Sequence, residues 1–412
     1  MRTHLTIVGG GLAGLVATIA AREAGLDVTL YEARSRLGGR ARSTPGAYHA
    51  NWGPHVIYTD GPLWSWLDRR GLARPAHRFP ARARVAFRAA GRARLLPPPA
   101  AGTGIMRLRN AHAPVDLSFS DWATQRLGDP AAAAQIAAFM GVVTFDYDPG
   151  RLSAAFVAER LRRATTFPPR VRYIPGGWGT LAARLAGHAR QLGARIETRS
   201  RVTCLPPAPV VLAIPLPRAA ELLGDPSLTW TGTRTALLDV AVTRRRLDPL
   251  LLSDLDQPGF AENYSIPDPN VAPSGESLIQ SQAGIRPGED LSQAVARLET
   301  LLDTAYTGWR DRQTWRRQFS LTGETGALDL PGTTWRDRPA GERGDGVHIA
   351  GDMVAAPGLL SEVSHQSAVM AIARLAAETP DPRRMTAAPT RLAHEHTVPY
   401  GADHTSPYGA AR

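Results

Sequence analysis

The N-terminal segment Thr6-Ile7-Val8-Gly9-Gly10-Gly11-Leu12-Ala13-Gly14 joins a short apolar run to a glycine turn, and Glu32 follows 18 residues after Gly14. Each of three spaced glycines has a use in a dinucleotide site. Gly9 makes the tight turn, Gly11 lets the backbone approach a pyrophosphate, and Gly14 lets a helix pack closely on the strand. The carboxylate of Glu32 can accept hydrogen bonds from a ribose diol. The stretch therefore predicts a βαβ unit that binds a dinucleotide.

The neighbouring residues give this motif a structural context. A β-like run covers residues 5–8, helical apolar spacing covers 12–24, Gly25 ends the helix, and a second β-like run covers 28–31. A helix that starts at the glycine turn directs free N–H groups and its positive dipole end at the phosphates. A glycine turn without a ligand is the competing interpretation, and the complete strand–turn–helix–strand order favours the binding site.

A second glycine pair follows the acid, in Arg36-Leu37-Gly38-Gly39-Arg40. Sites for NAD do not need this pair. The two glycines permit positive φ and a close approach of the backbone, and Arg40 can make bidentate contacts to a phosphate. A solvated surface arginine is the alternative for Arg40, and its position directly after the ribose acid favours the phosphate.

With this segment the chain resembles the large FAD-dependent family of amine oxidases, protoporphyrinogen oxidases and phytoene-type desaturases, in which an R-x-G-G-R segment wraps the FAD diphosphate. Residues 346–353 look like the closing strand and Gly-Asp motif of that family, here Gly351-Asp352, whose acid holds the ribityl chain or a hydroxyl beside the phosphates. The resemblance also implies that a helix opening at residues 362–368 directs its N-terminus at the flavin pyrimidine carbonyl, where the dipole stabilises reduced flavin.

Two further matches lie in the middle of the chain. Residues 173–180 resemble the P-G-G element of the desaturases, and residues 195–204 are expected to form a strand whose Val202 meets the adenine through its backbone. Together, the motifs and the resemblance imply non-covalent FAD and the cofactor-binding residues Gly9, Gly11, Leu12, Ala13, Gly14, Glu32, Ala33, Gly38, Gly39, Arg40, Gly53, Pro54, Val202, Gly351, Asp352 and Val363.

Residues 51–58 lie where the chain of this family passes the isoalloxazine ring, so Gly53-Pro54 is expected to turn against the flavin. His55 is the nearest titratable candidate for proton transfer, and His365 at the start of the last helix is a second catalytic candidate. For both, a histidine with a purely structural role is an equal alternative. Trp178, Tyr264, Phe319 and Trp335 are candidates for an apolar pocket, although ordinary core packing is the favoured interpretation of any single one of them. No metal site is expected.

Composition narrows the class of protein. The 412 residues carry a formal charge of +11, and every one of the 48 basic residues is arginine. A lysine near flavin N5, as in many amine oxidases, is therefore absent. Arginines crowd residues 69–94 without any nucleic-acid motif, so we expect a solvated face, or contact with an acidic substrate or an anionic membrane surface, and no nucleic-acid partner. Cys204 is the single cysteine.

The expected fold class is α/β, with a Rossmann-type FAD-binding domain of the glutathione-reductase kind and an interleaved α+β substrate domain. The FAD-binding domain is expected at residues 1–60, 171–216 and 341–378, the substrate domain at 61–170 and 217–340, and a disordered tail at 379–412 whose removal leaves FAD binding and melting nearly unchanged. Without an apolar run of about 18 residues or a leader, a cytoplasmic location is expected.

Within the substrate domain, the pattern predicts the following elements: helices at 62–70, 120–127, 130–145, 151–164 and 291–306, a hairpin at 85–96, and strands at 235–243, 277–282 and 314–320.

Four functions are compatible with these features. The first is an FAD-dependent dehydrogenase or desaturase of a hydrophobic small molecule, with hydride transfer to flavin N5. The second is a flavin amine or amino-acid oxidase, which the missing lysine disfavours. The third is a redox-neutral flavin isomerase, and the fourth is a prenyl-binding escort protein without FAD, which the intact nucleotide motifs disfavour. The substrate, the electron acceptor and the oligomeric state are not encoded in any motif.

Overall fold

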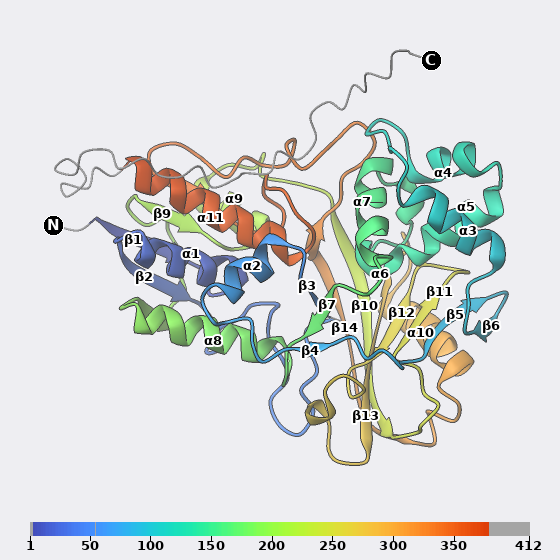
Figure 1. The fold of residues 1–412 in the computed structure, drawn as a ribbon. Helices are drawn as coiled ribbons and strands as arrows, with labels where there is room; N and C mark the ends of the chain where they lie inside the picture. The colour runs from blue at the N-terminus through green and yellow to red at the C-terminus, as the bar shows by residue number, and fades with distance from the viewer. Residues whose placement is uncertain (1–2, 54, 379–412) are drawn as a thin grey trace, which may run out of the picture.

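The computed structural model describes residues 3–53 and 55–378 (Figure 1). Pro54 and the expected tail at 379–412 lie outside the described residues. On one side of the molecule lies a parallel sheet with helices packed against it. On the other side lies a mainly antiparallel sheet with a helical cluster beside it (Figure 1).

A five-stranded parallel sheet forms around the N-terminal strand, in the order β15-β9-β1-β2-β8. Its strands are β1 (His4–Val8), β2 (Asp27–Glu32), β8 (Arg195–Thr198), β9 (Val210–Leu212) and β15 (Val347–Ile349). Strand β9 consists of Val210, Val211 and Leu212, all fully buried, as is typical of an inner parallel strand with both faces covered. The Rossmann-type sheet that the glycine motif predicted is confirmed.

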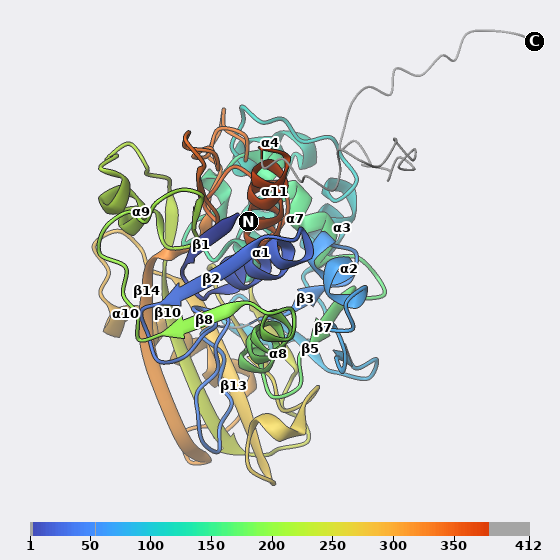
Figure 2. The ribbon, with the colours of Figure 1, turned by 90° about the vertical axis from the view of Figure 1, so that its left-hand side faces the viewer.

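Helices cover both faces of this sheet. Helices α1 (Leu12–Glu23), α8 (Trp178–Gln191) and α11 (Ser361–Glu378) lie side by side, and their apolar side chains share one core with β1 and β2. Helix α2 (Pro62–Asp68) joins the same core. The shorter α9 (Leu216–Leu223) packs in a separate core against β9 and β15, and Figure 2 shows it on the opposite face of the sheet from α1.

The second sheet has seven strands in the order β14-β10-β13-β12-β11-β5-β6. They are β5 (Val85–Ala89), β6 (Arg92–Arg94), β10 (Gly232–Thr243), β11 (Leu251–Asp254), β12 (Phe260–Asn263), β13 (Glu276–Gly284) and β14 (Gln313–Ala327). All neighbours are antiparallel except β11 and β5. Helix α10 (Leu291–Ala305), which begins with a capping box at Asp290 and Gln293, covers one face with an apolar stripe.

A helical cluster sits beside the seven-stranded sheet and has its own core. It comprises α3 (Pro99–Leu108), α4 (Phe119–Leu127), α5 (Pro130–Phe139), α6 (Gly141–Thr144), η1 (Pro149–Arg151) and α7 (Ala154–Ala164). The side chains of Ser118 and Asp129 accept hydrogen bonds from backbone N–H groups at the starts of α4 and α5, which fixes where these helices begin.

A small three-stranded sheet lies between the two large ones. It consists of β3 (Ile57–Tyr58), β7 (Val171–Tyr173) and β4 (His77–Arg78), all antiparallel, and η2 (Pro269–Val271) lies near the lower end of the antiparallel sheet. This sheet ties the segment after β2 to the segment before α8, and it therefore brings two parts of the chain that are far apart in sequence to the middle of the molecule.

Several predicted boundaries are wrong. The helix predicted at 130–145 is interrupted at Met140, and a side chain on Gly141 would come within 2.9 Å of Pro258, so glycine allows the 258–259 loop to approach the chain there. The strand predicted at 195–204 ends at Thr198. Helix α3, which begins at the last of three consecutive prolines, and the four-residue strands β11 and β12 were not predicted.

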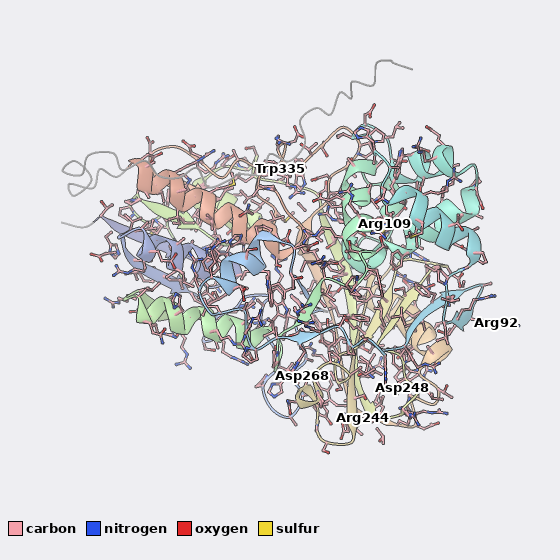
Figure 3. All side chains as sticks on the ribbon, viewed as in Figure 1. Arg92, Arg109, Arg244, Asp248, Asp268 and Trp335 are labelled. Atoms are coloured by element: carbon pink, nitrogen blue, oxygen red, sulfur yellow. The ribbon has the colours of Figure 1, made fainter. Side chains whose placement is uncertain are left out.

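Within the described part of the chain, no helix has the length and apolar character needed to cross a membrane. The arginine-rich segment 69–94 is partly neutralised: Arg70 pairs with Glu23, and Arg88 pairs with Asp254. Arg92 of β6 is exposed at the outer edge of the seven-stranded sheet, away from the parallel sheet (Figure 3).

Candidate active site

A cavity of about 700 Å³ runs from the glycine turn after β1 to the seven-stranded sheet. This volume lies in the range of pockets that hold small molecules and cofactors, about 300–1,000 Å³. The predicted cofactor-binding residues that line the cavity are Gly9, Gly11, Leu12, Ala13, Glu32, Ala33, Gly38, Gly39, Arg40, Gly53, Val202, Gly351 and Asp352. Gly14 and Val363 do not line this cavity, and Pro54 lies outside the described residues.

The three motif glycines have different structural roles. A side chain at Gly11 would meet no protein atom within 4 Å, so the space above its Cα is the cavity itself. A side chain at Gly14 would overlap the carbonyl oxygen of Gly9, which shows that Gly14 serves the close packing of α1 on β1. Gly9 has φ +104° and touches the backbone of Ala213. Only Gly11 therefore leaves room for a bound group.

Glu32, at the end of β2, faces the cavity and also holds the glycine turn that follows β1. Its carboxylate accepts hydrogen bonds from the N–H groups of Gly10 and Arg34, both at 2.8 Å. The second glycine pair closes on the same turn, because the Gly38 N–H donates to the Gly10 carbonyl at 2.7 Å. Gly38 has φ +108°, which glycine adopts without strain. The two glycine loops thus form one cradle.

Arg40 does not extend alone into the cavity. Its guanidinium donates two hydrogen bonds of 2.7 Å to the two carboxylate oxygens of Asp352. The pair joins the loop after β2 to the segment after β15, and both residues line the cavity. Sequence reasoning placed each of them separately on the cofactor and missed that they form one bidentate pair. Their contacts to a diphosphate or ribityl chain stay a prediction.

The remaining cradle residues lie in loops. Because β8 ends at Thr198, Val202 lies beyond the strand, and its carbonyl accepts a hydrogen bond from Arg218 at 3.2 Å. At the start of α11, Ser361 and Ser364 face the main cavity. Val363 instead lines a smaller neighbouring pocket together with Asp352. The N-terminus of α11 therefore faces the cavity, but Ser361 and Ser364 line it there and the predicted Val363 does not.

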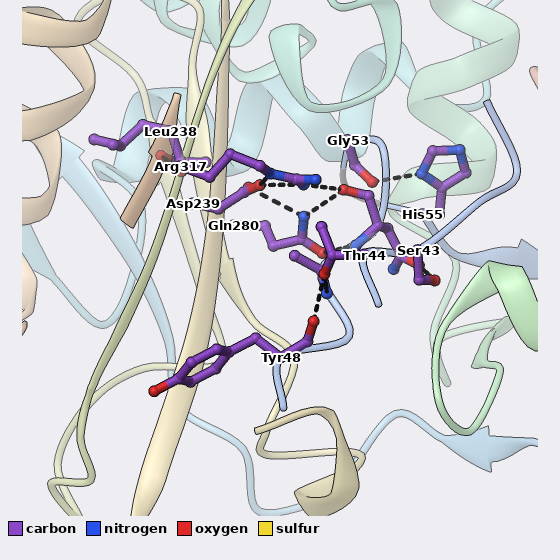
Figure 4. A network of polar contacts seen from close by, with 12 residues as sticks. Ser43, Thr44, Tyr48, Gly53, His55, Leu238, Asp239, Gln280 and Arg317 are labelled. Carbon is purple, nitrogen blue, oxygen red and sulfur yellow. Dashed lines mark hydrogen bonds and ion pairs between the residues drawn. The ribbon is translucent and has the colours of Figure 1, made fainter. Parts of the chain in front are cut away.

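Asn51 holds the segment that brings Gly53 and His55 to the cavity. Its backbone exchanges two hydrogen bonds with the side chain of Gln280, at 3.1 and 3.0 Å, and its carbonyl also accepts from Arg317 at 2.6 Å (Figure 4). Arg317 and Gln280 both bind the buried Asp239, whose pKa is raised by its burial. The side-chain oxygen of Asn51 accepts a hydrogen bond from the backbone N–H of Trp178 at 2.8 Å. This network fixes Gly53 and His55 between the two sheets.

His55 lines the cavity, and two contacts fix the orientation of its ring. Its Nδ1 lies 2.5 Å from the Gly53 carbonyl (Figure 4), and its ring lies against Trp178 at 4.9 Å between centroids. A carbonyl can only accept, so Nδ1 carries the hydrogen and Nε2 is left as an acceptor. Burial lowers the pKa of His55 to about 4, so the ring is neutral at physiological pH.

His365 lies apart from this cavity. It is buried in α11, its ring contacts Trp66 edge-on at 5.5 Å, and neither ring nitrogen has a hydrogen-bond partner among the described residues. Burial lowers its pKa to about 4. This position outside the cavity does not support a catalytic role for His365. A structural role, as a neutral ring buried in the core, fits the position better.

The far end of the cavity is mainly apolar and contains one acid and the amide side chain of Gln282. Val142, Val143, Phe145, Phe260 and Leu321 line it, together with the predicted Trp178 and Tyr264. Phe319 and Trp335, the other two pocket candidates, are not part of the lining. The interruption of the predicted helix at Met140 brings Val142, Val143 and Phe145 to this position.

Sequence reasoning missed the acid, which is Glu262. It lies on β12 with 6% of its surface exposed and accepts a hydrogen bond from the Tyr173 hydroxyl at 2.6 Å. Tyr264 is its second hydrogen-bond partner. Burial raises the pKa of Glu262 to about 7. The alternation Phe-Ala-Glu-Asn after Pro258-Gly259 was the available signal, since Phe260 and Glu262 share the cavity face of the strand.

The cradle end fits a dinucleotide on its own geometry. An open space above Gly11, a helix that starts there without a side-chain cap, and an acid at the end of β2 are the parts that a pyrophosphate and a ribose require. The cavity continues from this cradle to side chains of the seven-stranded sheet.

The chain matches a family model and a curated dehydrogenase in sequence. Residues 12–209 match the family described as flavin containing amine oxidoreductase. The 4,4'-diapolycopen-4-al dehydrogenase of Metabacillus indicus is 37% identical over 71 residues. That match covers 17% of this chain and 14% of the relative's length, so it concerns a small part of both proteins.

Solved structures show the same fold over nearly the whole chain. An oxidoreductase from Methanosarcina mazei superimposes with a TM-score of 0.74 at 16% identity, covering 90% of this chain and 100% of its own. Cyclohexylamine oxidase from Brevibacterium oxydans has a TM-score of 0.68 at 16% identity, covering 92% and 99%. The family match and the shared fold confirm the resemblance drawn from the glycine motifs. Residues 12–209 therefore match the flavin containing amine oxidoreductase family, and the chain as a whole shares the fold of cyclohexylamine oxidase.

Proposed function

We propose that the protein dehydrogenates a small molecule with a mainly apolar body, using FAD as the hydride acceptor. The observation that carries this proposal is the continuity of the cavity, which joins the dinucleotide cradle at Gly11 to a chamber lined by Val143, Phe145 and Phe260. An apolar substrate fits such a lining, and its burial excludes water from the reacting atoms.

When FAD is bound, its flavin supplies the two-electron acceptor for a hydride that leaves the substrate. The residues of the chain would bind and orient the substrate and shield the reacting atoms from water. The Asn51 network and the ring contact with Trp178 fix the segment that carries His55. The neutral His55 ring leaves Nε2 as an acceptor toward the cavity. Alignment of a substrate C–H bond supplies much of the rate enhancement in such reactions.

Oxidation of an amine is the second candidate, and Glu262 is the observation that favours it. A carboxylate in a mainly apolar chamber can pair with the ammonium group of a substrate. The absence of lysine from the sequence argues against the arrangement of many amine oxidases, in which a lysine lies near flavin N5. We therefore rank dehydrogenation of an apolar molecule first and amine oxidation second.

The experiment is anaerobic reduction of the FAD-loaded protein, followed as bleaching of the visible flavin absorption. The probes are a long apolar polyene aldehyde, as in the name of the Metabacillus indicus relative, and cyclohexylamine. Bleaching by the polyene alone supports the first candidate, and bleaching by cyclohexylamine supports the second. Turnover of a probe without net flavin reduction would instead support a redox-neutral reaction, and no effect of either probe would contradict both candidates.

A further inference from the structure

We propose that Glu262 accepts the proton that the substrate loses when it is dehydrogenated. The inference rests on the proposed function, because it assigns the second half of the same reaction. Neither sequence motifs nor the family match, which ends at residue 209, cover this position.

The position of Glu262 follows from the pleat of the seven-stranded sheet. On β12, Phe260 and Glu262 point to the cavity, whereas Ala261 packs into the core under α10. The neighbouring strand β13 places Gln282 opposite Phe260, and Gln282 also lines the cavity. The carboxylate is thus presented to the apolar chamber by a rigid central strand and not by a loop.

Two tyrosines hold the carboxylate in place. The Tyr173 hydroxyl donates to Glu262 at 2.6 Å, and Tyr264 is the second hydrogen-bond partner. The Tyr264 hydroxyl oxygen also accepts from the backbone N–H of His55 at 2.6 Å. Glu262 is therefore one hydrogen-bonded residue away from the segment expected to pass the flavin.

Glu262 has no salt-bridge partner among residues 3–53 and 55–378. The titratable groups that face it are Tyr58 from β3, Tyr173 from β7, Tyr264 after β12, Tyr306 after α10 and the neutral His55. None of these groups is cationic at neutral pH. Burial therefore raises the pKa of Glu262 to about 7, although both tyrosine hydrogen bonds act to lower it.

A carboxyl group that titrates near neutral pH is suited to general base catalysis, because it is both partly ionised and basic enough to accept a proton. In the proposed step, a substrate C–H bond would break and its hydrogen would leave as a hydride, with both electrons, which bound FAD would accept. The bond to hydrogen from the adjacent carbon or nitrogen, or from a hydroxyl oxygen of a hydrated aldehyde, would also break. Its electron pair forms the new double bond, and its proton goes to the Glu262 carboxylate, which becomes a carboxylic acid.

The variant Glu262→Gln tests this role, because glutamine keeps an oxygen that can accept from Tyr173 but cannot take up the proton. Glu276→Gln is the matched control. Glu276 also accepts from a tyrosine hydroxyl, that of Tyr48 at 2.9 Å, but it does not line the cavity. Tyr173→Phe removes one hydrogen bond that lowers the pKa of Glu262, so this variant should raise that pKa further.

The first readout is the infrared carbonyl stretch of protonated carboxyl groups in the FAD-loaded protein, which does not depend on turnover. We expect a band that titrates around pH 7, is lost in Glu262→Gln, persists in Glu276→Gln and titrates at higher pH in Tyr173→Phe. Absence of any such band from the wild type would overturn the proposal.

The second readout is anaerobic flavin reduction by whichever probe, the polyene aldehyde or cyclohexylamine, bleaches the wild type. We expect Glu262→Gln to slow reduction by roughly 10²–10⁴-fold and to abolish the loss of rate below about pH 7. An unchanged rate and pH profile in this variant would overturn the role of Glu262 alone. A wild type that no probe reduces would overturn the proposed function and this inference with it.

Discussion

The two ends of the cavity are built in opposite ways. The cradle end consists largely of backbone from two glycine loops that are close in sequence, between residues 9 and 40. The chamber end consists mainly of side chains from α6, α8, β12, β13 and β14, which span residues 142 to 321. Local motifs encode the first end, and only tertiary packing assembles the second.

The two ends also differ in charge. Five arginines and two acids line the cradle end, so positive charge is in excess where a diphosphate would place its negative charge: Arg34, Arg40, Arg42, Arg201 and Arg218 against Glu32 and Asp352. The chamber end has Glu262 as its charged group within the described lining. We infer that the cradle is built to bind an anion and the chamber to receive a neutral or cationic group. The following predictions separate the two ends.

The largest effect is expected where the cradle depends on close packing. Gly14→Val places a branched side chain onto the Gly9 carbonyl, and neither backbone segment can move away without separating α1 from β1. We expect a loss of unfolding free energy on the order of 4 kcal/mol, measured by urea denaturation of the flavin-free protein. A stability close to that of the wild type would show that the cradle tolerates separation of the helix from the strand.

The second-largest effect is the pH dependence of stability that the buried Glu262 of the chamber produces. The pKa of Glu262 is about 7 in the folded protein against a usual value of 4.5, so the folded state holds this proton more tightly. The resulting stabilisation is complete below about pH 4.5 and is lost as the pH rises through about 7. This loss amounts to about 3 kcal/mol.

Comparison with Glu262→Gln isolates this contribution in denaturation curves measured from pH 4 to 9. The variant should gain stability relative to the wild type as the pH rises. The low pKa values of His55 and His365, both about 4, have the opposite effect, because the folded protein loses stability as the pH falls from 6.5 to about 4. Both proteins share that effect, so the difference between them removes it. A difference that does not vary with pH would contradict the assigned titration of Glu262.

The smallest of these effects is expected for the acid of the cradle. Glu32→Ala removes an acceptor for the ribose and also the two hydrogen bonds that the carboxylate accepts from Gly10 and Arg34. Each charged hydrogen bond contributes about 1.5–3 kcal/mol, so FAD affinity should fall roughly ten- to a hundredfold. Titration of flavin-free protein with FAD measures this, and Glu32→Gln, which keeps an oxygen acceptor, should lose less.

The contrast between the ends also explains how much the sequence could predict. Gly9, Gly11 and Glu32 were predicted because their spacing follows from the geometry of one turn and its ligand, and Gly38 because its glycine pair resembles a segment of a known family. Glu262 was missed because β12 has only four residues and its acid looks like a surface residue until the sheet buries it. The Arg40–Asp352 pair was missed because its members lie 312 residues apart.

The central claim is that one end of the cavity holds FAD and the other performs the chemistry. The most direct test purifies Gly11→Val and Glu262→Gln side by side and records flavin content per protein and the rate of anaerobic flavin reduction. A side chain at Gly11 meets only the open cavity, so Gly11→Val should fold normally and lose its flavin. Glu262→Gln should retain flavin fully and be reduced slowly. Full flavin in Gly11→Val, or flavin loss in Glu262→Gln, would contradict the account.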